Sequence, residues 1–183
     1  MVTDCLRRVM ERHGLDRSAR IVVFGAGLIG GALIERLQAD GHNVAGIDKT
    51  PRHAGIHPLS EAGVVLGDAD VVVLLTARGS DFAPYVSRLK DGAVILDDTH
   101  PAFPRARLAA SGGESSVTYY KATATRPGLR IVPALPGYGA DWLPGCALEG
   151  IVLAEARIDG LPASQEEFDV AAERLGFRGL LAG

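Results

Sequence analysis

Three glycines at regular spacing follow a run of mostly β-branched residues, RIVVF, at positions 20–24. They form the pattern G-x-G-x-x-G, in which the first glycine permits a tight turn and the second lets a pyrophosphate approach the backbone. The third lets the following helix pack closely on the strand, and the start of that helix attracts phosphates. The alternative is a turn that only packs a helix on a sheet. The predicted phosphate-binding segment comprises Gly25, Ala26, Gly27, Leu28, Ile29 and Gly30.

An acidic residue, Asp48, ends the next apolar segment, NVAGID, at about the twenty-residue spacing from the glycines that dinucleotide sites show. Its carboxylate is suited to accept hydrogen bonds from the ribose hydroxyls of an adenosine. Because a carboxylate repels a 2′-phosphate, Asp48 favours NAD over NADP. Lys49, Thr50 and Arg52 follow where a 2′-phosphate would lie, so NADP stays open; the alternative is an ordinary solvated loop. We predict NAD or NADP as cofactor, with NAD slightly favoured, and assign Lys49 and Arg52 to its site.

One histidine, His100, lies just beyond the apolar segment 93–97. Ligands of open α/β sheets bind beyond the carboxyl ends of the strands. A histidine there could donate a proton to a carbonyl oxygen as hydride arrives, with Asp97 or Asp98 orienting it. The alternative is a plain turn, since the residues around His100 are common turn formers.

A second group of candidates includes a thiol, a phenol and a hydroxyl. Cys146 stands at the start of a predicted helix, where the helix N-terminus favours the nucleophilic thiolate; the alternative is a small buried side chain. Tyr138, in the preceding Gly/Pro-rich turn, is predicted to border a substrate cavity; the alternative is a solvated loop residue. Thr76 ends the strand 70–75 and is predicted to face the nicotinamide ribose or the phosphates, or else to cap the strand. The predicted catalytic residues are Cys146, His100 and Tyr138.

Alternating strands and helices must position these side chains. The predicted strands are 20–24, 43–48, 70–75, 93–97, 117–124 and 129–135. The predicted helices are 2–13, 27–40, 60–64, 81–90, 146–156 and one that begins at the capping box of Ser164 and Glu167. Alternation of this kind is typical of parallel sheets with right-handed crossovers. We therefore predict an α/β fold with a doubly wound parallel sheet, a Rossmann NAD(P)-binding domain with a C-terminal helical extension, as one domain over 1–183.

Composition excludes several classes of partner. The formal net charge is −3 and no basic tract is present, so we predict no nucleic-acid partner. The most apolar run, 71–75, is too short to span a bilayer. Cys5 and Cys146 lie far apart and suit a reducing compartment, so we predict a cytoplasmic protein without a membrane partner. His53 and His57 lie in a loop that contains Pro51 and Pro58, and no thiolate or carboxylate completes a set of metal ligands with them. We therefore predict no metal.

The segments ADVVVLLTA, DGAVILDDTHP and LPGCALEGIVLAEA follow the glycine motif in this order, and the likeness that they carry extends over residues 2 to about 157. This order resembles the coenzyme-binding domain of shikimate-dehydrogenase-like oxidoreductases, nearest to aldehyde-forming long-chain acyl-carrier-protein reductases. In that family, a cysteine of a Cys-x-x-Glu segment carries the acyl thioester that the nicotinamide reduces. The matching positions are Cys146 and Glu149. The sequence begins with the helix that would connect the two domains of these enzymes, so we expect their N-terminal substrate domain to be missing. It also has Asp48 where NADP-dependent members have asparagine.

These observations predict an NAD(P)-dependent oxidoreductase that acts on a carbonyl, imine or acyl-thioester carbon of a small or carrier-bound metabolite. The alternative is a non-catalytic dinucleotide-binding module or a subunit of a larger complex. One Rossmann domain has little surface to cover a substrate, so we predict a homodimer or a partner chain that closes the site. The apolar stripe of the first helix, Leu6, Val9 and Met10, is the predicted contact.

Overall fold

The computed structural model describes residues 1–110, 117–158, 162 and 164–183. The chain divides into two compact units. The larger unit comprises Arg8–Lys121 and Gly183, and the smaller unit comprises Met1–Arg7 and Ala122–Ala182. Two elements, helix α1 (Val2–His13) and strand β6 (Thr118–Thr125), run through both units. The single domain expected over 1–183 stays a prediction.

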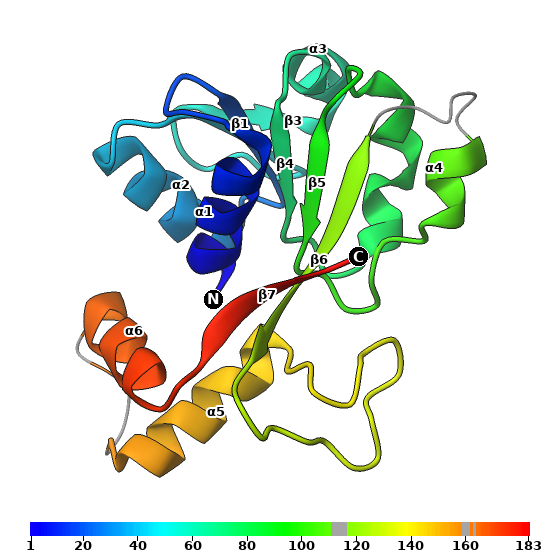
Figure 1. The fold of residues 1–183 in the computed structure, drawn as a ribbon. Coiled ribbons are helices and arrows are strands. Elements are labelled where there is room, and N and C mark those ends of the chain that lie inside the picture. Colours follow the sequence, from blue (N-terminus) through cyan, green and yellow to red (C-terminus); the bar gives the residue numbers. More distant parts are fainter. Residues whose placement is uncertain (111–116, 159–161, 163) are drawn as a thin grey trace. The chain divides into compact units, whose positions relative to one another are not determined.

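A seven-stranded sheet runs through the described residues in the order β3-β2-β1-β4-β5-β6-β7 (Figure 1). The strands are β1 (Arg20–Phe24), β2 (Asn43–Asp48), β3 (Ile56–Pro58), β4 (Val71–Leu74), β5 (Val94–Asp97), β6 and β7 (Arg178–Ala182). The pairs from β3 to β6 are all parallel. From β1 the chain adds β2 and β3 on one side and then crosses over to add β4, β5 and β6 on the other side. The crossover between β1 and β4 is that of the Rossmann dinucleotide-binding fold. The predicted fold class is therefore confirmed.

Helices connect the strands of the larger unit. They are α2 (Leu28–Ala39), the 3₁₀ helix η1 (Leu59–Glu61), α3 (Ala62–Gly67), the 3₁₀ helix η2 (Gly79–Arg88) and α4 (Ala106–Ala110). Helix α2 packs on one face, where Ile34 fills the space that a side chain at Gly46 would need. On the other face α3 and η2 contribute Leu66 and Phe82 to a core with Phe24. Both faces are thus covered, which is why β1 and β4 are continuous apolar runs.

Aromatic side chains extend this core from β1 toward β6. The rings of Phe24 and Phe82 have centroids 5.0 Å apart in an edge-to-face arrangement. The ring centroid of Phe103, which follows β5, lies 6.0 Å from that of Phe82 and 6.2 Å from that of Tyr119 in β6. Edge-to-face and tilted pairs of this kind add stabilisation beyond their buried area. These ring contacts anchor the loop after β5 through Phe103.

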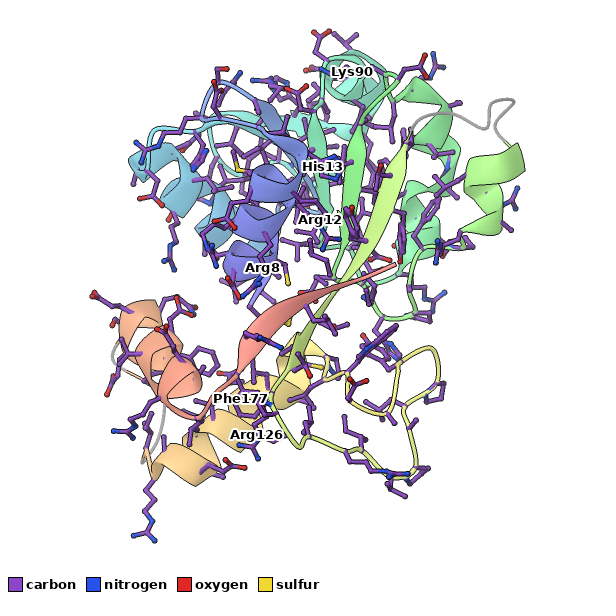
Figure 2. All side chains as sticks on the ribbon, viewed as in Figure 1. Arg8, Arg12, His13, Lys90, Arg126 and Phe177 are labelled. Atoms are coloured by element: carbon purple, nitrogen blue, oxygen red, sulfur yellow. The ribbon has the colours of Figure 1, made fainter. Side chains whose placement is uncertain are left out.

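The smaller unit has its own core, built from α5 (Gly145–Ala156), α6 (Gln165–Arg174), the end of β6 and Phe177, the residue before β7. Phe177 is buried in this core, and the guanidinium of Arg126 lies 4.5 Å from its ring centroid (Figure 2). Arg126 also binds Glu155 with two hydrogen bonds. The predicted cap of α6 is confirmed, since Ser164 Oγ accepts a hydrogen bond from Glu167 N at 3.1 Å.

Some predicted elements are wrong. The segment 129–135 is irregular, with a bend at 132–133, instead of a strand, because Pro133 and the nearby Pro136 lack the N–H that a strand ladder requires. The predicted helix 81–90 is present, but it begins two residues earlier and is the 3₁₀ helix η2, with Pro84 inside it. Strands β3 and β7 were not predicted. The prediction that the apolar stripe of the first helix forms a subunit contact is also wrong, because Leu6, Val9 and Met10 are buried within the chain. The homodimer or partner chain itself stays a prediction.

Candidate functional site

The first glycine of the motif closes a tight turn between β1 and α2. Gly25 has φ +100°, and a Cβ there would lie 2.7 Å from both Leu75 C and Thr76 N. Its N–H donates to Ile47 O at 2.9 Å, and Leu75 N donates to Phe24 O at 2.9 Å. The turn is therefore held between the ends of β2 and β4, and only glycine fits its conformation and its space.

The second and third glycines differ in their surroundings. A Cβ at Gly30 would overlap the carbonyl oxygen of Gly25 and lie 3.2 Å from Val23 Cγ1. Gly30 thus allows α2 to pack against β1. A Cβ at Gly27 would meet nothing within 4 Å. Gly27 therefore has no packing role in the chain, and its lack of a side chain leaves open the approach to the backbone that a pyrophosphate uses.

The start of α2 is open on its outer side. Gly27 is the N-cap residue, no side chain caps the helix, and its first turn contains no acidic residue. Leu28 and Ile29 are 93% and 70% exposed, which is unusual for side chains of their size. Uncapped N–H groups and the helix dipole favour an anion at this end. The two apolar side chains offer a surface that a bound ligand can cover.

Asp48 ends β2 next to the glycine turn, because its neighbour Ile47 accepts the hydrogen bond from Gly25 N. Asp48 Oδ1 accepts from Thr50 N at 2.8 Å. Asp48 Oδ2 has no hydrogen bond to any described residue, so it can accept from a ligand hydroxyl. Lys49 and Arg52 are exposed in the loop that follows. The carboxylate, the glycine turn and the α2 N-terminus thus share one edge of the sheet.

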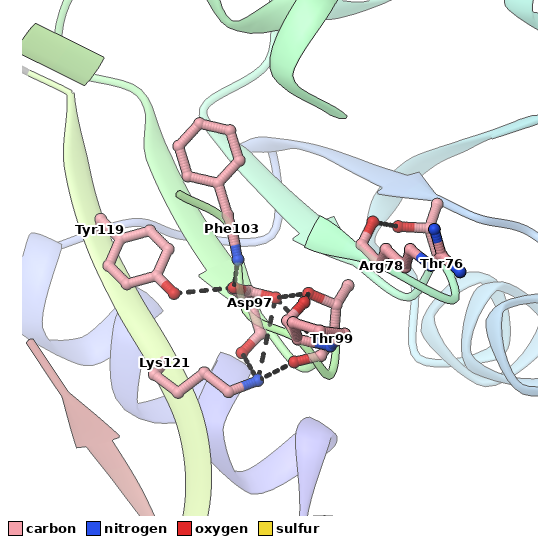
Figure 3. A network of polar contacts seen from close by, with 8 residues as sticks. Thr76, Arg78, Asp97, Thr99, Phe103, Tyr119 and Lys121 are labelled. Atoms are coloured by element: carbon pink, nitrogen blue, oxygen red, sulfur yellow. Dashed lines mark hydrogen bonds and ion pairs between the residues drawn. The ribbon is translucent and has the colours of Figure 1, made fainter. Parts of the chain in front are cut away.

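Thr76 lies at the same edge, beyond β4. Its hydroxyl donates to Arg78 O at 2.8 Å, which caps the end of the strand (Figure 3). The alternative prediction, that Thr76 caps the end of the strand, is therefore present in the structure. The Thr76 backbone lies against Gly25, and its side chain is half-buried. The contact of Thr76 with a cofactor stays a prediction.

A buried carboxylate, Asp97, holds the loop after β5 (Figure 3). Its Oδ1 accepts from Thr99 N at 2.7 Å and Thr99 Oγ1 at 2.6 Å. Its Oδ2 accepts from Phe103 N at 2.7 Å and from Tyr119 OH at 2.7 Å. These four donors fill the acceptor sites of a carboxylate. Asp97 is therefore a structural anchor, and the predicted role of orienting His100 stays a prediction for Asp98 alone.

A buried lysine of β6 completes this network and was missed by sequence reasoning. Lys121 Nζ donates to Asp97 O at 3.1 Å and to Thr99 O at 2.5 Å, and it lies 3.9 Å from Asp97 Oδ1. Asp97 and Lys121 are partners in the parallel register of β5 and β6. The available signal was a Tyr-x-Lys pattern, with Tyr119 and Lys121 on one strand face, next to a strand that ends in aspartate.

Asp98 and His100 stand at the edge of the same loop. Asp98 N donates to Leu74 O at 3.1 Å, so the residue lies beside the end of β4. Its carboxyl is half-buried and forms no hydrogen bond with a described residue. Burial raises the pKa of Asp98 to about 7, and Lys121 opposes the rise while Asp97 adds to it. His100 is exposed on the loop.

The other two predicted catalytic residues belong to the smaller unit. Cys146 is the second residue of α5 and is exposed, so the alternative of a small buried side chain is wrong for it. The buried cysteine is Cys5, whose thiol faces Thr123 O and Leu180 O. Tyr138 is half-buried in a turn, where its N–H donates to Leu135 O at 2.9 Å. The catalytic roles of Cys146 and Tyr138 stay predictions.

The two thiols should differ in reactivity. We expect one thiol per native chain to react rapidly with a disulfide reagent, and two after unfolding, because Cys146 is exposed and Cys5 is buried. Cys146→Ser should abolish the rapid reaction, whereas Cys5→Ser should leave it. Thiol titration of the three proteins checks this. Equal reaction of both native thiols would contradict the burial of Cys5.

The described residues contain neither a cluster of metal ligands nor a helix suited to a membrane. Among these residues, no three or more His, Cys, Asp or Glu side chains are grouped so that they could hold a metal ion. His57 instead pairs with Glu61, Nδ1 to Oε2 at 2.8 Å. In the same part of the chain, no helix is both long and apolar enough to cross a bilayer.

No protein-family model and no curated protein matches this sequence. Solved structures do. A D-isomer-specific 2-hydroxyacid dehydrogenase family protein from Klebsiella pneumoniae 342 matches with a TM-score of 0.51 and 18% identity, over 85% of this chain and 60% of that one. A D-lactate dehydrogenase from Sporolactobacillus matches with a TM-score of 0.39 and 26% identity, over 45% of this chain and 27% of that one.

A reductive aminase from Aspergillus terreus, in complex with NADPH and ethyl levulinate, matches with a TM-score of 0.46 and 18% identity, over 57% of this chain and 40% of that one. The chain therefore spans less than two thirds of the length of each of these three proteins. The Klebsiella match supports the α/β dinucleotide-binding fold. The resemblance to shikimate-dehydrogenase-like enzymes is supported only at this level of the fold.

Proposed function

We propose that this chain is an NAD(P)-dependent oxidoreductase domain that acts on a carbonyl or imine carbon. The observation that carries the proposal is the uncapped start of α2, where Gly27 leaves the backbone open beside an available oxygen of Asp48. The similar solved structures include dehydrogenases and a reductase, some of them bound to NAD or NADPH. They point to the same class of chemistry.

Each residue of the site has a distinct task in this proposal. The N–H groups at the α2 N-terminus bind the pyrophosphate, and Leu28 and Ile29 pack against the cofactor. Asp48 Oδ2 accepts from a ribose hydroxyl. A bound nicotinamide supplies or accepts hydride. The loop after β5, fixed by Asp97, holds the proton-transfer groups at the carboxyl ends of β4 and β5, where ligands of open α/β sheets bind.

Titration of the protein with NADH and NADPH, followed by cofactor fluorescence, tests the proposal. We expect micromolar to submicromolar binding of at least one of the two, and turnover with some member of a panel of 2-oxo acids, aldehydes and imines. Binding without turnover on any substrate, with candidate partner proteins added, favours the non-catalytic module instead. Absence of binding to both cofactors contradicts the proposal.

Asp48 should set the choice of cofactor. We expect Asp48→Asn to weaken NADH binding roughly tenfold, since a charged acceptor for the ribose is lost, and to strengthen NADPH binding, since repulsion of the 2′-phosphate is removed. Calorimetric titration of both cofactors checks this. Asp40→Asn, at an exposed residue beyond α2, is the matched control and should change neither affinity. A parallel loss of both affinities in Asp48→Asn contradicts the assignment.

An acyl thioester is a second candidate substrate. The exposed Cys146 at the start of α5 favours it, because an accessible thiol at a helix start suits the nucleophile that the resemblance to acyl-carrier-protein reductases implies. Alkylation of Cys146 should then abolish turnover of acyl thioesters and leave cofactor affinity unchanged. Turnover that survives alkylation removes this candidate. Free thiols also suit a cytoplasmic location.

A further inference from the structure

We propose that the carboxyl group of Asp98 is the proton donor and acceptor of this site, placed beside the nicotinamide end of the cofactor. The inference rests on the proposed function. It assigns to Asp98 the task for which His100 was the sequence-based candidate. Three observations carry it: the position of the residue at the strand ends, the unused carboxyl oxygens, and the charges arranged around them.

Position is given by a short chain of contacts within the larger unit. The backbone of Gly25 lies against Leu75 and Thr76, just beyond the end of β4. One residue earlier, Leu74 O accepts the hydrogen bond from Asp98 N at 3.1 Å. The glycine turn, the end of β4 and Asp98 therefore follow one another along the same edge of the sheet. Asp48 lies on the other side of the turn, so a dinucleotide with its ribose on Asp48 extends toward Asp98.

The two adjacent aspartates have opposite environments. Asp97 is fully buried and its oxygens are occupied by four donors. Asp98 is half-buried, and its carboxyl oxygens have no hydrogen-bond partner among the described residues. A loop that fixes one carboxylate completely while leaving its neighbour open presents the second group to a ligand. Because Asp97 holds the loop, Asp98 is preorganised rather than mobile.

The charges that act on Asp98 come from two neighbouring strands and from the N-terminus. Asp97 of β5 disfavours the ionised form of Asp98, whereas Lys121 of β6 and the N-terminal ammonium favour it. Strand β4 contributes no ionisable side chain between Val71 and Thr76. Burial is the largest influence and raises the pKa of Asp98 to about 7. Near neutral pH the group is therefore present in both forms, as a residue that gives a proton in one direction and takes it in the other must be.

The proton balance of the reaction fits this group. In the reducing direction, hydride from the cofactor reaches the carbonyl or imine carbon while the Asp98 O–H proton passes to the oxygen or nitrogen. The carboxylate that remains faces a cofactor that has become positively charged at its ring. The opposite charges then stabilise each other. In the oxidising direction the carboxylate takes the proton back.

Cofactor affinity measured against pH tests the proposal without any substrate. NAD⁺ carries a positive ring charge that NADH lacks, so NAD⁺ should lower the pKa of a facing carboxyl group and bind more tightly to its ionised form. We expect the affinity for NAD⁺ relative to NADH to rise roughly three- to tenfold between pH 5.5 and 8.5. Calorimetry of both cofactors across this range gives the ratio.

Asp98→Asn should make this ratio independent of pH while still binding both cofactors. Asp91→Asn, which removes the same charge from the turn before β5, is the matched control and should keep the pH dependence. Carboxyl carbon NMR of the free protein adds a second reading: a group that titrates near pH 7 in the wild type and is missing in Asp98→Asn. The variant should fold, because no described hydrogen bond to the Asp98 carboxyl is lost.

The outcomes separate this inference from the proposed function. Binding of both cofactors with a flat ratio in the wild type overturns the role of Asp98 and leaves the oxidoreductase proposal standing. A pH dependence that persists in Asp98→Asn has the same meaning and moves the role to another group, such as His100. Failure of the wild type to bind either cofactor removes the proposed function, and this inference falls with it.

Discussion

Gly27→Val should reduce the affinity for NADH at least about 100-fold, or about 2.7 kcal/mol, while leaving the melting temperature nearly unchanged. The structure separates these two effects. A Cβ at Gly27 meets nothing within 4 Å, so the folded chain accepts it, and Gly27 has φ −71°, which any residue adopts. The valine side chain fills the space through which a pyrophosphate reaches the α2 N-terminus. Fluorescence titration and thermal unfolding of the same samples check the prediction.

A matched control is Gly67→Val, at the last residue of α3, where a Cβ also meets nothing within 4 Å. It introduces the same side chain at an open glycine that takes no part in the site, and NADH should bind to it as to the wild type. Gly30→Val differs from both, since its Cβ overlaps Gly25 O and the fold itself should suffer. If Gly27→Val binds NADH normally, the backbone at this turn does not hold a pyrophosphate.

The strands that carry the site were predictable because their signal is local. β1 and β4 are short apolar runs that end in glycine or a polar residue, and the observed bounds agree with the predicted ones within a residue. β3 has only three residues, ends in Pro58 and has no apolar run of its own. It exists because β2 offers it a partner strand. Such an element depends on long-range pairing, which a local pattern does not contain.

The same distinction explains what was found and what was missed in the site. The roles of Gly25 and Gly30 follow from backbone geometry that the motif itself specifies. Asp97 is an anchor and Asp98 is not, because Asp97 is in register with Lys121 and accepts from the hydroxyl of Tyr119. Both partners lie on a strand more than twenty residues away in sequence. No pattern within DDTHP distinguishes the aspartate that faces the core from the one that faces the site.

Asp97→Ala should destabilise the protein by about 3–5 kcal/mol, the largest loss expected from any single substitution at the end of β5 or in the loop that follows it. The change leaves Thr99 N, Phe103 N and the Tyr119 hydroxyl without their acceptor in a buried region. It also leaves the ammonium of Lys121, with a side chain only 6% exposed, without its nearby carboxylate. Equilibrium unfolding in urea, with the midpoint and slope compared to the wild type, measures the loss.

Tyr119→Phe removes one donor to the same carboxylate and should cost only about 1 kcal/mol, because three other donors remain. The contrast between the two variants distinguishes a network that depends on its central carboxylate from a set of independent contacts. Asp98→Ala, which deletes a carboxyl group without described hydrogen bonds, should cost less than Asp97→Ala. Equal losses from the two aspartates would show that the buried carboxylate is not the anchor of the loop. The open carboxylate beside it would then have no fixed frame from which to meet a ligand.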